Sequence, residues 1–134
     1  MDYFAYGSLL NKVQMHKICP DAKPKFQAVL PNFRLVFSGW SRELKSSTAT
    51  IIAFRGGKVN GGVWDIAEKD LQKLDRYEDY PMTYDHINVL VLNDMEDATK
   101  AMAYIKKRQA DPAKPSPEYT ATIRQGYIDW GIEF

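Results

Sequence analysis

The feature that most constrains this chain is a succession of short segments rich in β-branched and aromatic residues. Four of them lie between residues 25 and 66, namely Lys25–Leu30, Phe33–Ser38, Thr48–Phe54 and Val59–Ile66. Turn-forming residues separate them, at Pro31-Asn32, Gly39 and Gly56-Gly57. The pattern therefore predicts four strands. Gly61-Gly62 lies inside the last of them, where glycine indicates a bulge or the close approach of another backbone.

Three further segments have the character of strands. Tyr3–Tyr6 is aromatic and compact, which is typical of a short buried strand, and it stops at the turn-forming pair Gly7-Ser8. Tyr84–Leu92 alternates between apolar and polar residues, which predicts a half-buried strand. Thr99–Ile105 is its expected partner.

Two helices are expected in the first two thirds of the chain. The first begins at Asn11, whose side chain can cap it, with Gln14 three residues later. The second follows the fourth strand, with Asp65 and Glu68 as its capping pair, and it cannot continue past Pro81.

A third helix near the end of the chain has the clearest signals. Ser116 is its expected N-cap, Pro117 occupies the first turn, and Gly131 marks its end. The proline-containing stretch Lys106–Ser116 before it predicts a surface loop.

These elements fit one domain over residues 1–134, of class α+β. No repeat or linker divides the chain, and 134 residues, 45% of them hydrophobic, suffice for one core. Clustered strands with few helices predict a small, mixed, β-barrel-like sheet flanked by a few helices.

Charge and cysteine content limit the classes of partner and the cellular compartment that we expect for this protein. With 18 Lys+Arg against 17 Asp+Glu, the net charge of +1 argues against a nucleic-acid or membrane-surface protein. No apolar run approaches the ~20 residues of a membrane span, and the first strand begins too early for a secretory leader. Cys19 is the single cysteine, so it cannot form an internal disulfide. We therefore expect a cytoplasmic protein.

A strand-to-helix turn is the first candidate for a site. In Tyr6-Gly7-Ser8-Leu9 the backbone passes through glycine, which leaves N–H groups free at a helix start, where they favour a carboxylate or an oxyanion. A plain tight turn has the same pattern, and no phosphate-loop motif accompanies it.

Glu78 is the second candidate. It lies where the second helix is expected to end, beside Asp79 and near aromatic residues. The helix dipole, the like charge of Asp79 and desolvation would each raise the pKa of its carboxyl group, which suits a group that exchanges protons near neutral pH. A solvated surface glutamate is the alternative.

Tyrosines at the ends of elements form the third candidate. Tyr6, Tyr80, Tyr84 and Tyr119 could line a cavity with polar tips, and core packing would explain them equally well. Lys106-Lys107-Arg108 is expected at a solvated strand end. The two histidines, His16 and His86, have no ligand spacing around them, so no metal site is expected.

Six pieces of sequence occur in one order along nearly the whole chain. They are Tyr3-Phe4-Ala5-Tyr6-Gly7-Ser8, Ser47-Thr48-Ala49-Thr50-Ile51, Gly62-Val63-Trp64-Asp65-Ile66, Leu74-Asp75-Arg76-Tyr77-Glu78, Tyr84, and Pro115-Ser116-Pro117-Glu118-Tyr119. In type and order they resemble the gamma-glutamylcyclotransferase-like family, which includes AIG2-like proteins. Each piece alone is weak evidence for this resemblance, whereas the ordered set is specific to the family.

The resemblance implies a mixed five-stranded barrel with a glutamyl-binding cavity at one end. It also implies an intramolecular reaction, in which the α-amine of a γ-glutamyl group attacks its own γ-carbonyl and gives 5-oxoproline and a free amine. Glu78 falls on the family's catalytic acid/base position. The loop Tyr6-Gly7-Ser8-Leu9 would hold the glutamyl group, while Tyr84 and Tyr119 would line its cavity. The substrate is a small γ-glutamyl compound, no cofactor is implied, and the oligomeric state stays unknown.

The sequence departs from that family at two places. The family's loop usually has Asn where this chain has Leu9, and it often has Gly where this chain has Asp79. Backbone contacts survive a change of side chain, so activity is compatible with both departures. A non-catalytic small-molecule or partner-binding module on the same fold is the alternative.

Overall fold

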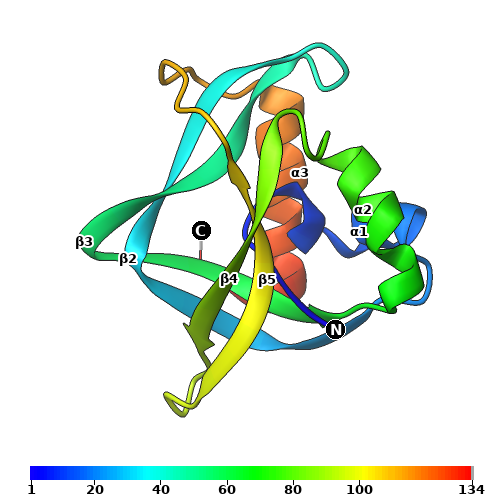
Figure 1. Ribbon diagram of the computed structural model, residues 1–134, viewed down its shortest axis with the longest axis vertical. Coiled ribbons are helices and arrows are strands. Elements are labelled where there is room, and N and C mark those ends of the chain that lie inside the picture. The colour runs from blue at the N-terminus through cyan, green and yellow to red at the C-terminus, as the bar shows by residue number, and fades with distance from the viewer. Residues whose placement is uncertain (134) are drawn as a thin grey trace.

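The computed structural model describes residues 1–133 and consists of a closed β-barrel flanked by helices (Figure 1). In chain order the elements are β1 (Asp2–Ala5), η1 (Ser8–Leu10), α1 (Lys12–Ile18), β2 (Lys23–Ser41), β3 (Ser46–Asp65), η2 (Glu68–Asp70), α2 (Leu71–Tyr77), β4 (Tyr84–Leu92), β5 (Ala98–Lys106) and α3 (Pro117–Trp130). Figure 1 shows α1 and α2 together on one side of the barrel.

The short strand β1 closes the barrel. The strand order is β1-β3-β2-β4-β5, and β1 pairs antiparallel with β3 and parallel with β5. This confirms the predicted α+β class with a small mixed barrel. Because β1 and β5 are parallel, their carboxyl ends lie at the same end of the barrel.

Apolar residues fill two cores, one on each face of the barrel wall. Along β1, Phe4 packs in the core that also contains Val63 and Val91, whereas its neighbour Tyr3 packs with Trp64 in the core that also contains residues of the helices. Successive side chains of a strand point to opposite faces, so the wall is buried on both sides here. This explains why Tyr3–Tyr6 contains no charged residue.

The strands β2 and β3 are longer than the sequence predicts. Each of the expected strand pairs is one continuous strand, because Pro31-Asn32 and Gly56-Gly57 form an irregularity within the β2–β3 pair instead of turns. Asn32 and Gly56 both have positive φ, and the Gly56 N–H donates to Asn32 Oδ1. The strands therefore bend at this point without ending. Because such a bend and a true turn use the same residue types, the local sequence does not distinguish them.

Gly61 and Gly62 confirm the expected close approach. A Cβ on Gly61 would collide with the carbonyl oxygen of Ala5, and a Cβ on Gly62 would lie 2.5 Å from the Trp130 ring of α3. The absence of side chains at these two positions therefore lets β3 pair with β1 on one edge and pack against α3 on one face.

All three expected helices are present, and their predicted N-caps are confirmed at α1 and α3 and wrong at α2. Asn11 accepts from Gln14 N–H, Ser116 accepts from Tyr119 N–H, and Gly131 ends α3 with a φ of 68°. In contrast, Asp65 is the last residue of β3 and lies 3.4 Å from the Met1 ammonium. The chain reaches α2 through η2, which has no side-chain cap.

No helix within residues 1–133 has the length and apolar character needed to cross a membrane.

Gly62→Ala tests the contact between the barrel and α3. The added methyl group would displace the Trp130 ring, so we expect the free energy of unfolding to fall by about 1–3 kcal/mol, as in other overpacked cores. Urea denaturation measures the change. Lys58→Ala, at an exposed position of the same strand, should stay within about 0.5 kcal/mol of the parent protein. Equal stability of Gly62→Ala and the parent would contradict the packing described here.

Candidate active site

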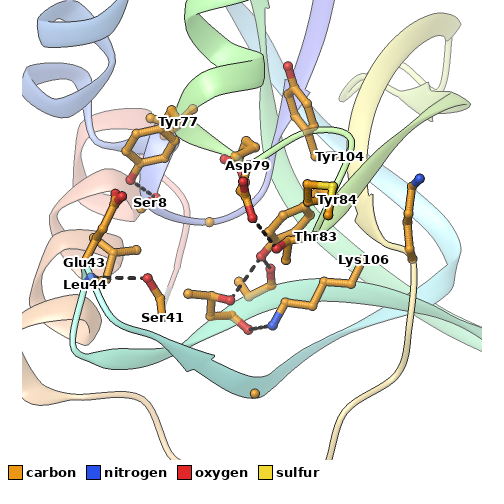
Figure 2. A pocket seen from close by; sticks show the side chains of 18 of the residues that line it. Ser8, Ser41, Glu43, Leu44, Tyr77, Asp79, Thr83, Tyr84, Tyr104 and Lys106 are labelled. Atoms are coloured by element: carbon orange, nitrogen blue, oxygen red, sulfur yellow. Dashed lines mark hydrogen bonds between the residues drawn. The ribbon is translucent and has the colours of Figure 1, made fainter.

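A cavity of about 880 Å³ opens at the end of the barrel where β1 and β5 finish (Figure 2). Seven residues singled out from the sequence line it, namely Tyr6, Gly7, Ser8, Leu9, Glu78, Tyr84 and Tyr119. The expectation for Tyr80 was wrong, because its ring stacks on His86 and does not line the cavity. They come from β1 and the turn after it, the end of α2, the start of β4 and the start of α3. The fold therefore brings segments far apart in the sequence to one place.

The turn after β1 forms one wall of the cavity. Leu10 N–H donates to Gly7 O and Asn11 N–H donates to Ser8 O, so these two bonds leave the N–H groups of Ser8 and Leu9 unused. A Cβ on Gly7 would lie 3.3 Å from Ala49 Cβ, so a side chain there would crowd the cavity wall. Leu9 is 2% exposed and belongs to the core. Its side chain consequently contributes mainly packing.

Tyrosine hydroxyl groups surround the backbone of Ala49. Tyr84 Oη donates to Ala49 O over 2.6 Å, and Tyr119 Oη accepts from Ala49 N–H over 3.1 Å. Tyr6 Oη donates to Tyr104 O over 2.6 Å. The proton of Tyr119 is not used in its bond to Ala49, so this hydroxyl can still donate into the cavity.

Ser8 and Tyr77 add a second polar pair to the wall. Ser8 Oγ and Tyr77 Oη are 2.9 Å apart and hydrogen bonded (Figure 2). Tyr77 is the last residue of α2 and directly precedes Glu78. This pair therefore connects the turn after β1 with the end of the helix that carries the glutamate.

Glu78 lines the cavity as the C-cap residue of α2. Within residues 1–133, no hydrogen-bond donor contacts its carboxyl group. Desolvation by burial raises the pKa of Glu78 from its ordinary value of 4.5 to about 8, and the positive charge of Lys106 opposes that rise. The neighbouring Asp79, expected from the sequence to contribute, instead accepts from Thr83 Oγ1 over 2.6 Å. The result is a carboxyl group able to exchange protons near neutral pH.

Lys106 is the site residue that the sequence analysis missed. The expectation of a solvated strand end was wrong for it, because its Nζ donates to Ser38 O over 2.7 Å and to Thr48 O over 3.3 Å. Nζ also lies 5.8 Å from the centre of the Tyr84 ring. Burial lowers the pKa of Lys106, and Glu78 opposes that shift. No local pattern distinguishes this lysine from Lys107, because only barrel closure brings β2 and β3 beside it.

A hydrogen-bonded network lies directly behind Glu78. The Asp75 carboxylate accepts from Tyr104 Oη over 2.6 Å and lies 2.7 Å from His86 Nε2. The Tyr80 ring stacks on His86, with centroids 4.0 Å apart and an interplanar angle of 5°. The backbone on both sides of Glu78 is thus attached to one histidine of β4.

Cys19 is buried, and desolvation raises the pKa of its thiol to about 11, so the group is a protonated thiol at neutral pH. In the described part of the chain, no three His, Cys, Asp or Glu side chains come together as metal ligands could.

The raised pKa of Glu78 makes folding stability depend on pH. Between its ordinary pKa and about 8, the folded chain holds a proton that the unfolded chain lacks. The associated stability is complete below about pH 4.5, decreases steadily as the pH rises toward 8, and is lost above that. Glu78→Gln removes this loss, so the variant should gain up to about 5 kcal/mol relative to the parent protein between about pH 4.5 and about pH 8.

Urea denaturation at several pH values measures this gain, and Glu68→Gln, at an exposed carboxyl group, is the control. A constant difference between parent and Glu78→Gln over the whole range would show that the Glu78 pKa is not raised.

Comparison with known proteins places the chain in a family. A family model described as "Gamma-glutamyl cyclotransferase, AIG2-like" matches residues 3–124. Gamma-glutamylcyclotransferase of Homo sapiens is 32% identical over 136 residues, which cover 97% of this chain and 71% of the human protein. The Bos taurus protein of that name is 30% identical over 135 residues, with the same coverage of both chains. A solved structure described as gamma-glutamyl cyclotransferase has a TM-score of 0.92 at 29% identity and covers 98% of this chain and 80% of that one. The chain therefore belongs to the AIG2-like gamma-glutamyl cyclotransferase family.

Proposed function

We propose that this protein is a gamma-glutamyl cyclotransferase that converts a small γ-glutamyl compound into 5-oxoproline and a free amine. The observation that carries the proposal is Glu78, a carboxyl group with a pKa near 8 in a cavity of about 880 Å³. Family membership and the human relative of that name support the reaction class.

The glutamyl group would bind against the turn after β1. The unused N–H groups of Ser8 and Leu9 can donate to an anionic oxygen of the substrate. The Tyr84 and Tyr119 rings would hold the glutamyl chain folded, so that its α-amine meets its own γ-carbonyl. Bringing the two reacting groups together in this way is a large part of the rate gain in intramolecular reactions.

Glu78 would move one proton through the reaction. The α-ammonium gives a proton to the Glu78 carboxylate, and the free amine attacks the γ-carbonyl carbon to form a new C–N bond. The bond from that carbon to the departing nitrogen then breaks, and Glu78 returns the proton to this nitrogen. The ring nitrogen still bears one proton too many after the attack and loses it to solvent, and the released amine takes up a proton from solvent at neutral pH. The carboxyl group ends in its starting state, so one residue serves as base and then as acid.

Negative charge on the γ-carbonyl oxygen would be stabilised by donors in the wall. Tyr119 is one candidate, because its hydroxyl proton is not used in the bond with Ala49. A preorganised donor of this kind is often worth about 3 kcal/mol in a transition state. Lys106 supplies positive charge nearby and partly offsets the cost of ionising Glu78.

Release of 5-oxoproline from a panel of γ-glutamyl compounds tests the reaction and the role of Glu78 together. We expect turnover of at least one compound by the parent protein and a loss of kcat of at least about a hundredfold in Glu78→Gln, as for other general acid–base groups. Glu68→Gln should keep the parent rate.

A folded parent protein that releases no 5-oxoproline from any compound would refute the enzyme assignment. Ligands that raise its Tm without being consumed would then identify the non-catalytic binding module instead.

The pH dependence of kcat/KM tests the state of the carboxyl group. Only the ionised form of Glu78 can accept the proton of the α-ammonium, so kcat/KM should rise about tenfold per pH unit below pH 8 and level off above it. A plateau that begins near pH 5 would indicate an ordinary solvated carboxylate and contradict the proposed role of burial.

A further inference from the structure

The segment that carries Glu78 is attached at both of its ends to one histidine. Glu78 ends α2, and the chain then turns through Asp79, whose φ is 52°. Asp75 lies three residues before Glu78, and Tyr80 lies two residues after it. The side chains of Asp75 and Tyr80 both contact His86 of β4. His86 therefore holds the two ends of a short segment that contains Glu78.

The attachment at Asp75 is a hydrogen bond to the barrel wall. Asp75 Oδ1 lies 2.7 Å from His86 Nε2 and accepts from Tyr104 Oη over 2.6 Å. Because an ionised carboxylate only accepts hydrogen bonds, the imidazole donates through Nε2. His86 of β4 and Tyr104 of β5 are directly paired in the sheet. The last turn of α2 is thereby fixed to two neighbouring strands.

The attachment at Tyr80 is a ring stack. The Tyr80 and His86 rings have centroids 4.0 Å apart and an interplanar angle of 5°. The Tyr104 ring meets the same imidazole at 73°, with centroids 5.3 Å apart. In addition, Tyr80 N–H donates to Asp75 O over 2.8 Å, which joins the two ends of the segment. A rotation of the imidazole would therefore disturb both ring contacts and the bond to Asp75.

Glu78 depends on these attachments for its position. The helix α2 has seven residues, and an isolated helix of that length does not persist in water. In the part of the chain that the structure describes, no hydrogen-bond donor contacts the Glu78 carboxyl group. The location of the carboxyl group in the cavity is consequently set by the backbone that carries it, and this backbone is held by His86.

We propose that His86 is a positioning residue, which keeps the Glu78 carboxyl group at the cavity and out of bulk solvent by fixing Asp75 and Tyr80. This inference rests on the proposed role of Glu78 as the proton carrier. His86 does not line the cavity, so it acts on the reaction only through the segment from Asp75 to Tyr80. Proton transfer requires hydrogen-bond distance, and a displacement of about 1 Å can reduce a rate by about a hundredfold.

Three substitutions separate the two contacts of the imidazole. His86→Ala removes both, His86→Phe keeps a ring for the stack on Tyr80, and His86→Gln keeps an amide donor for Asp75. We expect kcat for a γ-glutamyl compound that the parent converts to fall about tenfold to a hundredfold in His86→Ala, with KM within about twofold. His86→Phe and His86→Gln should each retain part of the lost kcat, because each keeps one contact.

Asn88→Ala is the matched control. Asn88 lies two residues further along β4, on the same face of the strand as His86, and it is exposed. This variant should keep the kcat and KM of the parent protein. An unchanged kcat in folded His86→Ala, a loss that lies in KM alone, or an equal loss of kcat in Asn88→Ala would overturn the positioning role.

A second measurement needs no substrate. Removal of His86 should admit water to the Glu78 carboxyl group and bring its pKa back toward 4.5. The stability that Glu78→Gln gains as the pH rises from about 4.5 to about 8 should then be smaller by at least about half in the His86→Ala background. Urea denaturation of the parent, the two single variants and the double variant gives this comparison. His86→Phe carries the same measurement if His86→Ala does not fold.

The other titratable groups that face Glu78 do not disturb this comparison. Apart from Lys106, they are the hydroxyl groups of Tyr3, Tyr6, Tyr77, Tyr84, Tyr104 and Tyr119. Burial raises the pKa of each of these tyrosines, so they stay protonated over the whole range. Lys106 is common to all four proteins, and residue 86 is the same in both members of each pair, so their contributions cancel.

The two measurements separate this inference from the proposed reaction. A parent protein that converts no compound would refute the reaction, whereas a smaller gain of Glu78→Gln in the His86→Ala background would still support the role of His86 in holding Glu78. An equal gain in both backgrounds, with the fold retained, would overturn this inference even in an active enzyme.

Discussion

The parallel pairing of β1 with β5 is the constraint on which the rest of the structure depends. The strand β1 has four residues, yet it pairs with β3 on one edge and β5 on the other, and both of its faces are buried. Since parallel strands finish at the same end, the turn Tyr6–Leu9 and the cation Lys106 meet there. Tyr84 joins them because β4 begins opposite Lys106. The pairing of β1 with β5 therefore both closes the barrel and brings the cavity residues together.

Burial of Glu78 has an energetic cost that its surroundings must offset. Its carboxyl group has no hydrogen-bond donor among the described residues, and a desolvated carboxyl group of this kind favours the protonated state. Placing it also requires order at a helix end, where chains tend to fray. The network behind it provides that order, because Asp75 is bound to Tyr104 and His86, and Tyr80 stacks on the same histidine. Two barrel strands thereby hold the chain on both sides of the carboxyl group.

Sequence patterns predicted the elements well and their long-range relations less well. The strand Tyr84–Leu92 and the caps Asn11 and Ser116 depend on interactions within a few residues, and they were confirmed. Pro31-Asn32 and Gly56-Gly57 were misassigned as turns, because a bend in a long strand pair has the same local chemistry as a turn. The ordered motifs indicated which residues would meet at the cavity. They gave no sign of Lys106, whose burial arises from oxygens of Ser38 and Thr48, more than 50 residues away in sequence.

The inner and outer parts of the cavity differ in whether their polar groups are already hydrogen bonded within the protein. Near Ala49, the hydroxyl groups of Tyr84 and Tyr119 are bonded to one backbone segment, so their positions are fixed before any ligand arrives. At the mouth, Arg42, Lys107 and Arg108 are exposed and unpaired within the described chain. Fixed dipoles suit a reacting group whose geometry must not vary, because they need no reorganisation during the reaction. Exposed cations differ from these dipoles, because attraction between exposed charges tolerates many geometries. The inner part of the cavity therefore presents hydrogen-bonding groups in fixed positions, whereas its mouth presents exposed positive charge.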